Sequence, residues 1–355
     1  MKALFINARD ITFDSRSKRN CELLANIYDI KAHHIGTNFN INNNLISIGS
    51  KNKATFCLNI LKASLKKDIS FIYTIGLPSL ILALPAKIIS GKKLIYDSRE
   101  LYILDAEGES TYTWKHRLLE RISITFVHAI IAANELRMNV MKNKYFSVKY
   151  FSYLLNIPYQ ITVKKKEKLN IKKNTLVYQG HIGAKRGLDK LIKSCNIISE
   201  KVKIIFIVPK DNREELKELM RYHGSDLEYD IFEFMPQEEM LSFISQFDIG
   251  FLSYELVGLN NIYCEPNKLY EYALAHLKIL SSPQEKFVKS FKEFNIGHAL
   301  TKEAWDSNDY KKMSTQIELL INKDCPKSEF EKFNSFHSNE KELWRLKKFT
   351  QSIFQ

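Results

Sequence analysis

Short apolar runs and amphipathic stretches alternate along the first half of the chain. Short segments that we interpret as strands, most of them predominantly apolar, lie at 2–6, 29–35, 45–48, 69–74, 93–96 and 129–132. Apolar residues spaced by three and four positions predict helices over 19–27, 51–67, 78–89, 113–126 and 135–142. Buried strands separated by amphipathic helices are typical of a parallel sheet that carries helices on both faces.

The same alternation begins again in the second half. We expect strands at 175–178, 203–208, 229–234, 249–252 and 277–281. We expect helices at 187–198, 212–222, 238–246, 285–294 and 310–321, and another that starts at Asn267. The lysine-rich run 164–168 lacks helical periodicity and is interpreted as a linker.

A chain of 355 residues suits two domains rather than one. We expect an α/β protein with two Rossmann-like parallel-sheet domains, 1–160 and 161–337, and a terminal helix within 338–355. The hydrophobic content of 45% is enough to fill both cores.

The chain is basic, with a formal net charge of +13. This positive charge indicates either a partner with an acidic surface or an excess of basic side chains that only face solvent. It does not distinguish nucleic acid from anionic lipid as the partner. The 5 cysteines are scattered, which supports neither a disulfide framework nor a zinc site. The first apolar run is too short for a signal peptide, and no run reaches the roughly 18 residues of a membrane span. We therefore expect a cytoplasmic location.

Two stretches suggest a site for a phosphorylated ligand. Pro266 and Asn267 open a predicted helix, whose N-terminus presents free backbone N–H groups to an anion. Glu271 lies one turn further, where its carboxylate can accept hydrogen bonds from paired ribose hydroxyls. The alternative is an ordinary capped amphipathic helix.

The second stretch joins the strand ending near Tyr178 to the helix after Gly187, and contains Gly180 and Gly183. Glycines let the backbone approach a phosphate closely, and the planar fork of Arg186 can bind two phosphate oxygens at once. The spacing is neither G-x-G-x-x-G nor that of a P-loop. The alternative is that Arg186 is an ordinary exposed charge.

Both stretches closely resemble motifs of family 4 (group 1) retaining glycosyltransferases: the PNK-x-x-E-Y segment at 266–272 and the Y-Q-G…R-G-L loop at 178–188. That resemblance implies the GT-B fold, two Rossmann-like domains facing across a cleft, with a C-terminal helix that crosses back to the first domain. It also implies that Glu271 binds the ribose and Arg186 the diphosphate of a nucleotide-sugar donor. His181 stands where many members have arginine.

The family resemblance extends to a third motif, because 96–100 resembles the family's Tyr-Asp-x-His-Glu segment, with Arg99 in the usual histidine position. It makes Asp97, Arg99 and Glu100 candidates for orienting the acceptor or stabilising leaving-group charge, although Asp97 could equally cap the following turn. The candidate catalytic residues are Arg186, Glu271 and Glu100. The residues expected to bind the nucleotide sugar are Gly180, His181, Gly183, Arg186, Tyr263, Asn267, Lys268, Leu269 and Glu271.

Two further departures from the family pattern lie before and after the helix that begins at Asn267. Tyr263 replaces a glutamate that often contacts the donor sugar, and His276 and Lys278 replace a Gly-x-Pro after the helix. Glycine at such a position usually adopts a left-handed conformation, so the geometry of this turn is open. A transferase that has lost its activity is therefore one alternative.

Metal-binding signatures are missing from the sequence. There is no Asp-x-Asp and no H-E-x-x-H, and the 9 histidines form no helical ligand pair. We expect neither metal nor cofactor, with the nucleotide sugar acting as substrate.

Two basic helices are candidates for contact with an anionic membrane surface: 51–67, with five lysines around apolar residues, and 115–121 beside Trp114. The alternative for each is a core-facing helix with a solvated basic back. The lysines lack the aromatic interleaving of a nucleic-acid surface, and no nucleic-acid partner is expected.

The sequence thus predicts a metal-independent, retaining glycosyltransferase of surface polysaccharide or glycolipid assembly. Its partners would be a nucleotide sugar, a glycan or polyprenyl-linked acceptor, and the inner face of the plasma membrane. Two alternatives stay open: a GT-B nucleotide-sugar epimerase, and a non-enzymatic basic protein that binds nucleic acid or membrane.

Overall fold

The computed structural model describes residues 1–10, 14–36, 44–105, 108, 110, 112–158, 163, 166–167, 172–183, 186–307 and 309–355. The chain forms two compact units. Unit 1 comprises Met1–Tyr159 and Asn339–Gln355, and unit 2 comprises Gln160–Ser338.

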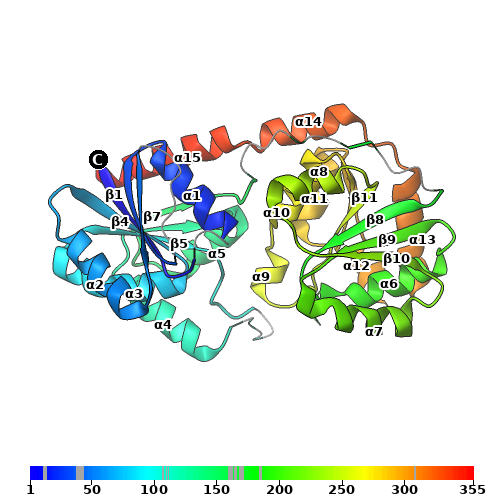
Figure 1. The fold of residues 1–355 in the computed structure, drawn as a ribbon, viewed down its shortest axis with the longest axis horizontal. Coiled ribbons are helices and arrows are strands. Elements are labelled where there is room, and N and C mark those ends of the chain that lie inside the picture. Colours follow the sequence, from blue (N-terminus) through cyan, green and yellow to red (C-terminus); the bar gives the residue numbers. More distant parts are fainter. Residues whose placement is uncertain are drawn as a thin grey trace. The chain divides into compact units, whose positions relative to one another are not determined.

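Unit 1 is built on a seven-stranded parallel sheet with strand order β3-β2-β1-β4-β5-β6-β7. Its strands are β1 (Lys2–Asn7), β2 (Asp29–Ile35), β3 (Leu45–Ser50), β4 (Ile69–Ile75), β5 (Lys93–Ser98), β6 (Ala129–Ala132) and β7 (Tyr150–Tyr153). Its helices are α1 (Ser15–Ala25), α2 (Lys53–Ser64), α3 (Leu77–Ser90), α4 (Trp114–Ile124), α5 (Glu135–Lys144) and α15 (Asn339–Phe354). Helices α1 and α15 cover one face of the sheet, and α2 and α3 cover the other (Figure 1).

The C-terminal helix belongs to the core of unit 1. Leu346 and Ile353 of α15 are buried in the same apolar cluster as Ala3 and Phe5 of β1. Tyr28 donates a hydrogen bond to Thr350 Oγ1 over 2.8 Å. The predicted return of the C-terminal helix to the first domain is therefore confirmed.

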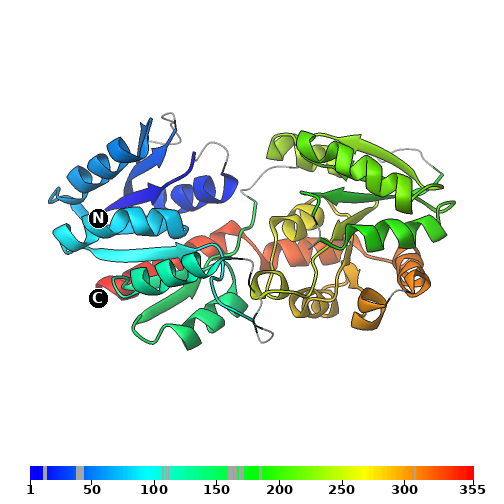
Figure 2. The same ribbon diagram turned by 90° about the horizontal axis from the view of Figure 1, so that it is seen from below.

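Unit 2 has a six-stranded parallel sheet with order β10-β9-β8-β11-β12-β13. Its strands are β8 (Asn174–Gln179), β9 (Val202–Ile207), β10 (Glu228–Phe232), β11 (Ile249–Leu252), β12 (Lys278–Ser281) and β13 (Gly297–Ala299). Its helices are α6 (Leu188–Ile197), α7 (Arg213–His223), α8 (Gln237–Ile244), α9 (Leu259–Ile262), α10 (Asn267–Leu274), α11 (Glu285–Glu293), α12 (Lys302–Asp306), α13 (Tyr310–Asn322) and α14 (Lys327–Phe336), with a 3₁₀ turn η3 (Lys210–Asn212). Figure 2 shows helices on both faces of each sheet.

Both sheets follow the doubly wound order in which the first strand of the unit lies centrally, beside the second and fourth. The predicted architecture of two Rossmann-like domains is confirmed. Sequence reasoning missed β7 and β13, which have only four and three residues, and the helices α9, α12 and α14. Of the predicted linker 164–168, only Lys166 and Glu167 lie within the described residues.

A buried carboxyl group joins three elements of unit 1. Glu120 of α4 has an exposed fraction of 0%. It accepts hydrogen bonds from the hydroxyls of Tyr96, over 3.1 Å, and of Tyr145. No cation contributes to its electrostatics, and burial raises the pKa of Glu120 to about 7.

Because the pKa of Glu120 is raised in the folded state, we expect the contribution of Glu120 to the free energy of unfolding of unit 1 to fall as pH rises. Below the ordinary pKa of 4.5 the carboxyl group is protonated in both states, so it costs nothing. Between pH 4.5 and 7 the unfolded chain loses the proton while the folded chain keeps it, which costs about 3 kcal/mol of folding free energy by pH 8. Glu120→Gln should remove this dependence, so the variant should gain stability over the wild type as pH rises, measured by urea unfolding at pH 5 and pH 8.

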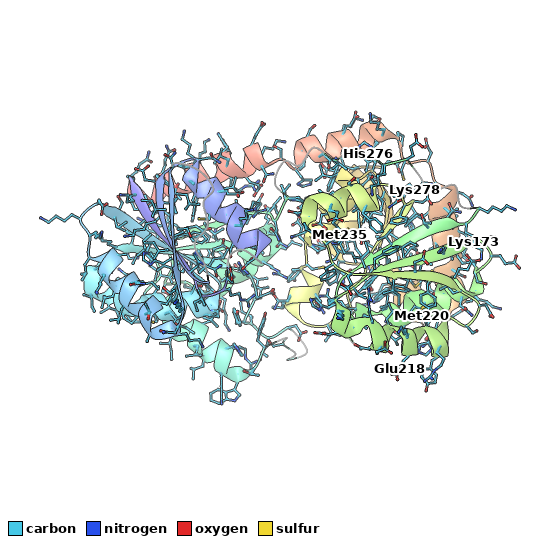
Figure 3. All side chains as sticks on the ribbon, in the orientation of Figure 1. Lys173, Glu218, Met220, Met235, His276 and Lys278 are labelled. Atoms are coloured by element: carbon cyan, nitrogen blue, oxygen red, sulfur yellow. The ribbon has the colours of Figure 1, made fainter. Side chains whose placement is uncertain are left out.

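Glu218→Gln is the matched control for that experiment, because Glu218 lies on the outer side of α7 and is exposed (Figure 3). Identical pH profiles for wild type and Glu120→Gln would contradict the prediction.

Candidate functional site

The glycine-containing loop of unit 2 begins where the strand order reverses. β8 pairs with β9 on one side and with β11 on the other, and the loops after β8 and β11 leave the sheet in different directions. In open α/β sheets, this crevice at the carboxyl ends of the strands is where ligands bind. The loop 180–187 follows β8, and Tyr254 follows β11 by two residues.

Arg186 lies in the loop after β8, at this edge of the sheet, and is held on two sides. Its guanidinium carbon is 4.7 Å from the centre of the Tyr254 ring, a cation–π contact. Its carbonyl oxygen accepts a hydrogen bond from the hydroxyl of Ser253, and its N–H donates to Gly183 O over 3.0 Å. Within the described residues Arg186 forms no ion pair. The planar, charged group is positioned but not neutralised.

Gly187 fixes the position of Arg186 from the other side. Its φ of +60° is left-handed. A Cβ atom there would come within 2.6 Å of the Trp305 ring and 2.9 Å of Glu255 Oε1. The Trp305 indole N–H in turn donates to Glu255 over 3.2 Å, and Lys190 forms an ion pair with the same carboxylate over 2.9 Å. A side chain at position 187 would therefore displace the loop.

Lys268 reaches the loop from α10. Its Cε and Nζ atoms lie 3.6 and 3.8 Å from the position that a Cβ on Gly180 would occupy, which places the ammonium group beside the loop. Burial lowers the pKa of Lys268; the Glu271 carboxylate opposes this effect and the charge of Arg186 adds to it. Lys268 is thus within electrostatic range of both Glu271 and Arg186.

The N-terminus of α10 has no side-chain cap. Pro266, at the N-cap position, is extended and forms no side-chain capping hydrogen bond. Among the predicted binding residues, Leu269 is different: its side chain is fully buried, and its N–H donates to Pro266 O over 3.1 Å. Leu269 therefore anchors the helix in the core. Asn267 and Lys268 are half-buried at the open end.

Glu271 is buried, with an exposed fraction of 6%. The side-chain amide of Gln237, the first residue of α8, donates to Glu271 Oε1 over 3.1 Å. The other oxygen, Oε2, has no hydrogen-bond partner. A buried carboxylate oxygen without a donor is costly, and it indicates a place for a donor from a ligand.

The remaining residues of the glycine loop are arranged differently. His181 is exposed, its ring stands edge-on to Phe234 with centres 5.8 Å apart, and its carbonyl oxygen accepts from the Tyr178 hydroxyl over 2.7 Å. Gly183 contributes the carbonyl group that Arg186 N–H contacts. Ala184 and Lys185 lie outside the described residues.

Tyr263 ends the short helix α9 and is half-buried, beside the buried Asn260. The nearby Glu265 is engaged elsewhere: it accepts from the Tyr270 hydroxyl and pairs with Lys286 over 2.9 Å. Glu265 therefore stabilises the turn before α10.

The turn after α10 has the conformation that a glycine would supply. His276 has φ 58°, the only left-handed non-glycine residue in the described part of the chain. Its ring stacks on Phe330, with centres 5.3 Å apart and planes at 14°, at the turn between α10 and β12 (Figure 3). This contact offsets the steric cost of a side chain in that conformation.

In unit 1, Asp97 is buried inside a polar network. It accepts from Arg16 over 3.1 Å, Asn20 over 2.6 Å and Tyr73 over 2.8 Å. These contacts join α1 to β4 and β5. Asp97 therefore holds α1 at the carboxyl edge of the sheet, and does not merely cap the turn that follows it.

Arg99 and Glu100, the other two polar residues of that motif, differ in exposure. Arg99 forms an ion pair with Asp14 and donates to the Ser17 hydroxyl. The Glu100 side chain is 37% exposed and lies 3.6 Å from Arg137, whose guanidinium also donates to Arg99 O over 2.7 Å. Among Asp97, Arg99 and Glu100, the side chain of Glu100 is therefore the one that a ligand can most readily reach.

Sequence reasoning missed Gln237, Tyr254 and Arg137. The first two follow predicted strands closely, so the rule that ligands bind at the carboxyl ends of strands could have identified them. Arg137 lies inside a helix, and nothing in its local sequence sets it apart from an exposed arginine. No group of three or more His, Cys, Asp or Glu side chains suited to a metal ion occurs among the described residues.

No family model and no curated protein matches the sequence. Solved structures do match the fold. Sucrose-phosphate synthase from Thermosynechococcus elongatus aligns with a TM-score of 0.69 at 10% identity, covering 100% of this chain and 99% of the other. HepE from Anabaena, in complex with UDP and glucose, aligns with a TM-score of 0.64 at 13% identity, over 99% and 94% of the two chains.

The lipopolysaccharide outer core galactosyltransferase WaaB, in its apo form, aligns with a TM-score of 0.67 at 12% identity, covering 99% of each chain. At such identities a likeness shows the fold alone. The two Rossmann-like units therefore have the GT-B architecture of these glycosyltransferases.

The packing around Gly187 gives a prediction. Gly187→Ala should destabilise unit 2 by about 2–4 kcal/mol, because the left-handed backbone disfavours alanine and the added methyl meets the Trp305 ring. Gly91→Ala is the matched control, since Gly91 has φ +68° with nothing within 4 Å of an added Cβ. Urea unfolding of both variants measures the difference; equal losses of stability would show that the Trp305 contact is unimportant.

Proposed function

We propose that this protein is a glycosyltransferase that transfers a sugar from a nucleotide-sugar donor bound to unit 2. The observation that carries this proposal is the arrangement around Lys268. In the described part of the chain Lys268 and Arg186 are two cations without an ion pair, and Glu271 has an oxygen without a hydrogen-bond partner. A nucleoside diphosphate has the complementary groups, namely a dianionic diphosphate and a ribose diol.

In this proposal the diphosphate lies against Arg186, Lys268 and the open N-terminus of α10, whose first N–H groups carry a partial positive charge. The ribose hydroxyls donate to Glu271. Gly180 and Gly183 give the backbone a close approach, and Tyr263 lies toward the sugar. His181 is a weaker contributor than an arginine would be, because its ring packs against Phe234.

The chemistry follows from the charges. Breaking the bond between sugar and diphosphate leaves negative charge on the departing nucleoside diphosphate, which Arg186 and Lys268 can stabilise without reorganising. These cations would take the place that a divalent metal has in other transferases, so we propose a metal-independent reaction. Retention of configuration is proposed from the resemblance of the two donor-site motifs to the retaining family.

The acceptor is proposed to approach from unit 1, with Glu100 as the group that orients its hydroxyl. The ion pair with Arg137 would hold the Glu100 carboxylate in place. WaaB, one of the structures that share the fold, is an enzyme of the lipopolysaccharide outer core. This supports a glycan or lipid-linked acceptor in surface polysaccharide or glycolipid assembly.

The surface of α4 supports attachment to an anionic membrane. Exposed apolar side chains alternate there with basic ones: Trp114, Leu118, Leu119 and Ile122 with Lys115, Arg117 and Arg121. The neighbouring helix α3 adds exposed Ile88 and Ile89. In α2, Phe56 and Ile60 are buried in the core and Leu58 is exposed, so α2 presents fewer exposed apolar side chains than α4, and α4 is the stronger candidate. Within the described residues, no helix has the length and apolar character to cross a bilayer.

The donor site predicts nucleotide binding that depends on Arg186 and Glu271. Calorimetric titration with UDP, GDP, ADP and CDP should identify one that binds, and Arg186→Ala and Glu271→Ala should each weaken its binding by about 10- to 100-fold, the loss expected for hydrogen bonds to charged groups. UDP comes first in the panel because HepE was solved with UDP and glucose.

Arg221→Ala is the control for that titration, since Arg221 makes a similar cation–π contact with Tyr222, 5.0 Å away on α7. It should leave binding unchanged. Failure of the folded wild type to bind any of the four diphosphates would refute the donor site. Once the donor is known, transfer of its sugar to a glycan, rather than a changed sugar on the same nucleotide, distinguishes a transferase from an epimerase.

The α4 surface predicts binding to vesicles that contain anionic lipid. Trp114→Ala should reduce cosedimentation with phosphatidylglycerol vesicles several-fold, because Trp114 is 61% exposed and would enter the interface. Trp344→Ala is the matched control: Trp344 of α15 is 59% exposed and also lies beside a lysine, Lys348. Equal effects of the two variants, or equal binding to phosphatidylcholine vesicles, would contradict a specific membrane surface on α4.

A further inference from the structure

We propose that Gln237 is a positioning residue for Glu271: its amide holds the carboxylate ready for a ligand and keeps it from pairing with Lys268. This inference rests on the proposed nucleotide site and adds a residue that neither sequence motif contains. Gln237 is the first residue of α8, and its Nε2 atom is 3.1 Å from Glu271 Oε1.

The position of Gln237 follows from the fold of unit 2. β10 ends at Phe232, and Pro236 precedes α8 in an extended conformation, which places the first residue of the helix at the carboxyl edge of the sheet. α8 and α10 pack against each other on the same side of the sheet. A side chain at the start of α8 therefore reaches across to α10.

The amide group suits this role because it is neutral. A carboxylate has two oxygens and about four acceptor positions, and Gln237 occupies one of them without cancelling the charge. Oε2 is left buried, charged and without a partner. An arginine or lysine at position 237 would neutralise Glu271, and would remove its attraction for ribose hydroxyls.

Lys268 is the competitor that Gln237 excludes. Glu271 and Lys268 lie three residues apart on α10, a spacing at which side chains of a helix meet. The carboxylate acts on the pKa of Lys268, yet neither residue forms an ion pair within the described part of the chain. If the two paired, the ammonium would be withdrawn from the diphosphate and the carboxylate from the ribose. Gln237 therefore keeps both groups available.

The experiment uses the full-length protein and the diphosphate that binds most tightly among UDP, GDP, ADP and CDP. Gln237→Leu should weaken its binding about 10-fold. In the Glu271→Ala background the same change should have no further effect, because a positioning residue acts only through the group that it positions. Gln246→Leu is the control: this amide lies just beyond α8 and donates to Phe243 O over 2.8 Å, away from α10.

A second variant tests the hydrogen bond itself and does not depend on how Gln237→Leu folds. In Gln237→Glu, two carboxyl groups face each other beside Lys268 and Arg186. When ionised they repel, and when one is protonated it can donate as the amide does. The affinity of Gln237→Glu relative to wild type should therefore rise as pH falls from 8 to 5.5, whereas that of Gln237→Leu should stay constant.

The outcomes separate this inference from the proposed function. If wild type binds and Glu271→Ala weakens binding, but Gln237→Leu binds like wild type, the role of Gln237 is refuted and the donor site stands. Additive losses in the double variant would also refute it, because Gln237 would then act independently of Glu271. If none of the four diphosphates binds to folded wild type, both proposals fail.

Discussion

Burial of both faces of each parallel sheet confines the polar chemistry of this protein to the ends of the strands. Ile204, Phe206 and Ile279 have no exposed surface, because helices cover the sheet on both sides. Only at the carboxyl edge do strands give way to loops and helix N-termini that have polar groups. Asp97 in unit 1 and Arg186 in unit 2 both lie there, in loops or at strand ends that the core beneath them holds in place.

Buried backbone groups also need hydrogen-bond partners where the chain leaves unit 1 and where it returns to unit 1. The buried guanidinium of Arg19 donates to the carbonyl oxygens of Leu155 and Ile157. The Leu155 N–H donates to the buried Glu342 over 2.7 Å, and Asn339 donates to Pro158 O over 2.8 Å. Backbone groups in this non-strand segment would otherwise be buried without partners, so charged and amide side chains replace the missing sheet neighbours. Helix α1, the segment 155–158 and helix α15 are thereby fixed to one another in unit 1.

Much of the fold could be predicted from the sequence because apolar periodicity reports burial directly. The strands 29–35, 129–132 and 249–252 were predicted to the residue. The last two are short apolar runs, too short for a helix and placed between amphipathic stretches of helix length, which favours buried strands. β7 and β13 could not be, because they are short edge strands whose pairing depends on the sheet already present. Glu271 and Arg186 were found from their motifs, but Gln237 was not, because its contact joins residues 34 positions apart. His276 shows the same limit, since its left-handed turn depends on stacking against Phe330, which lies 54 positions further along the chain.

The proposed donor site of unit 2 has interactions that do not favour stability. Two like charges near each other, and a buried carboxylate oxygen without a donor, both raise the free energy of the folded state. Neighbouring contacts compensate for this: the Tyr254 ring stacks on Arg186, and the Gln237 amide satisfies one oxygen of Glu271. Neither contact is an ion pair, so neither neutralises the charge that it holds. An ion pair would stabilise the site without a ligand and would compete with ligand binding. An aromatic ring and an amide hold the charged groups in position without neutralising them. The arrangement is therefore consistent with the proposed binding of an anionic ligand with adjacent hydroxyls, and contributes little to stability.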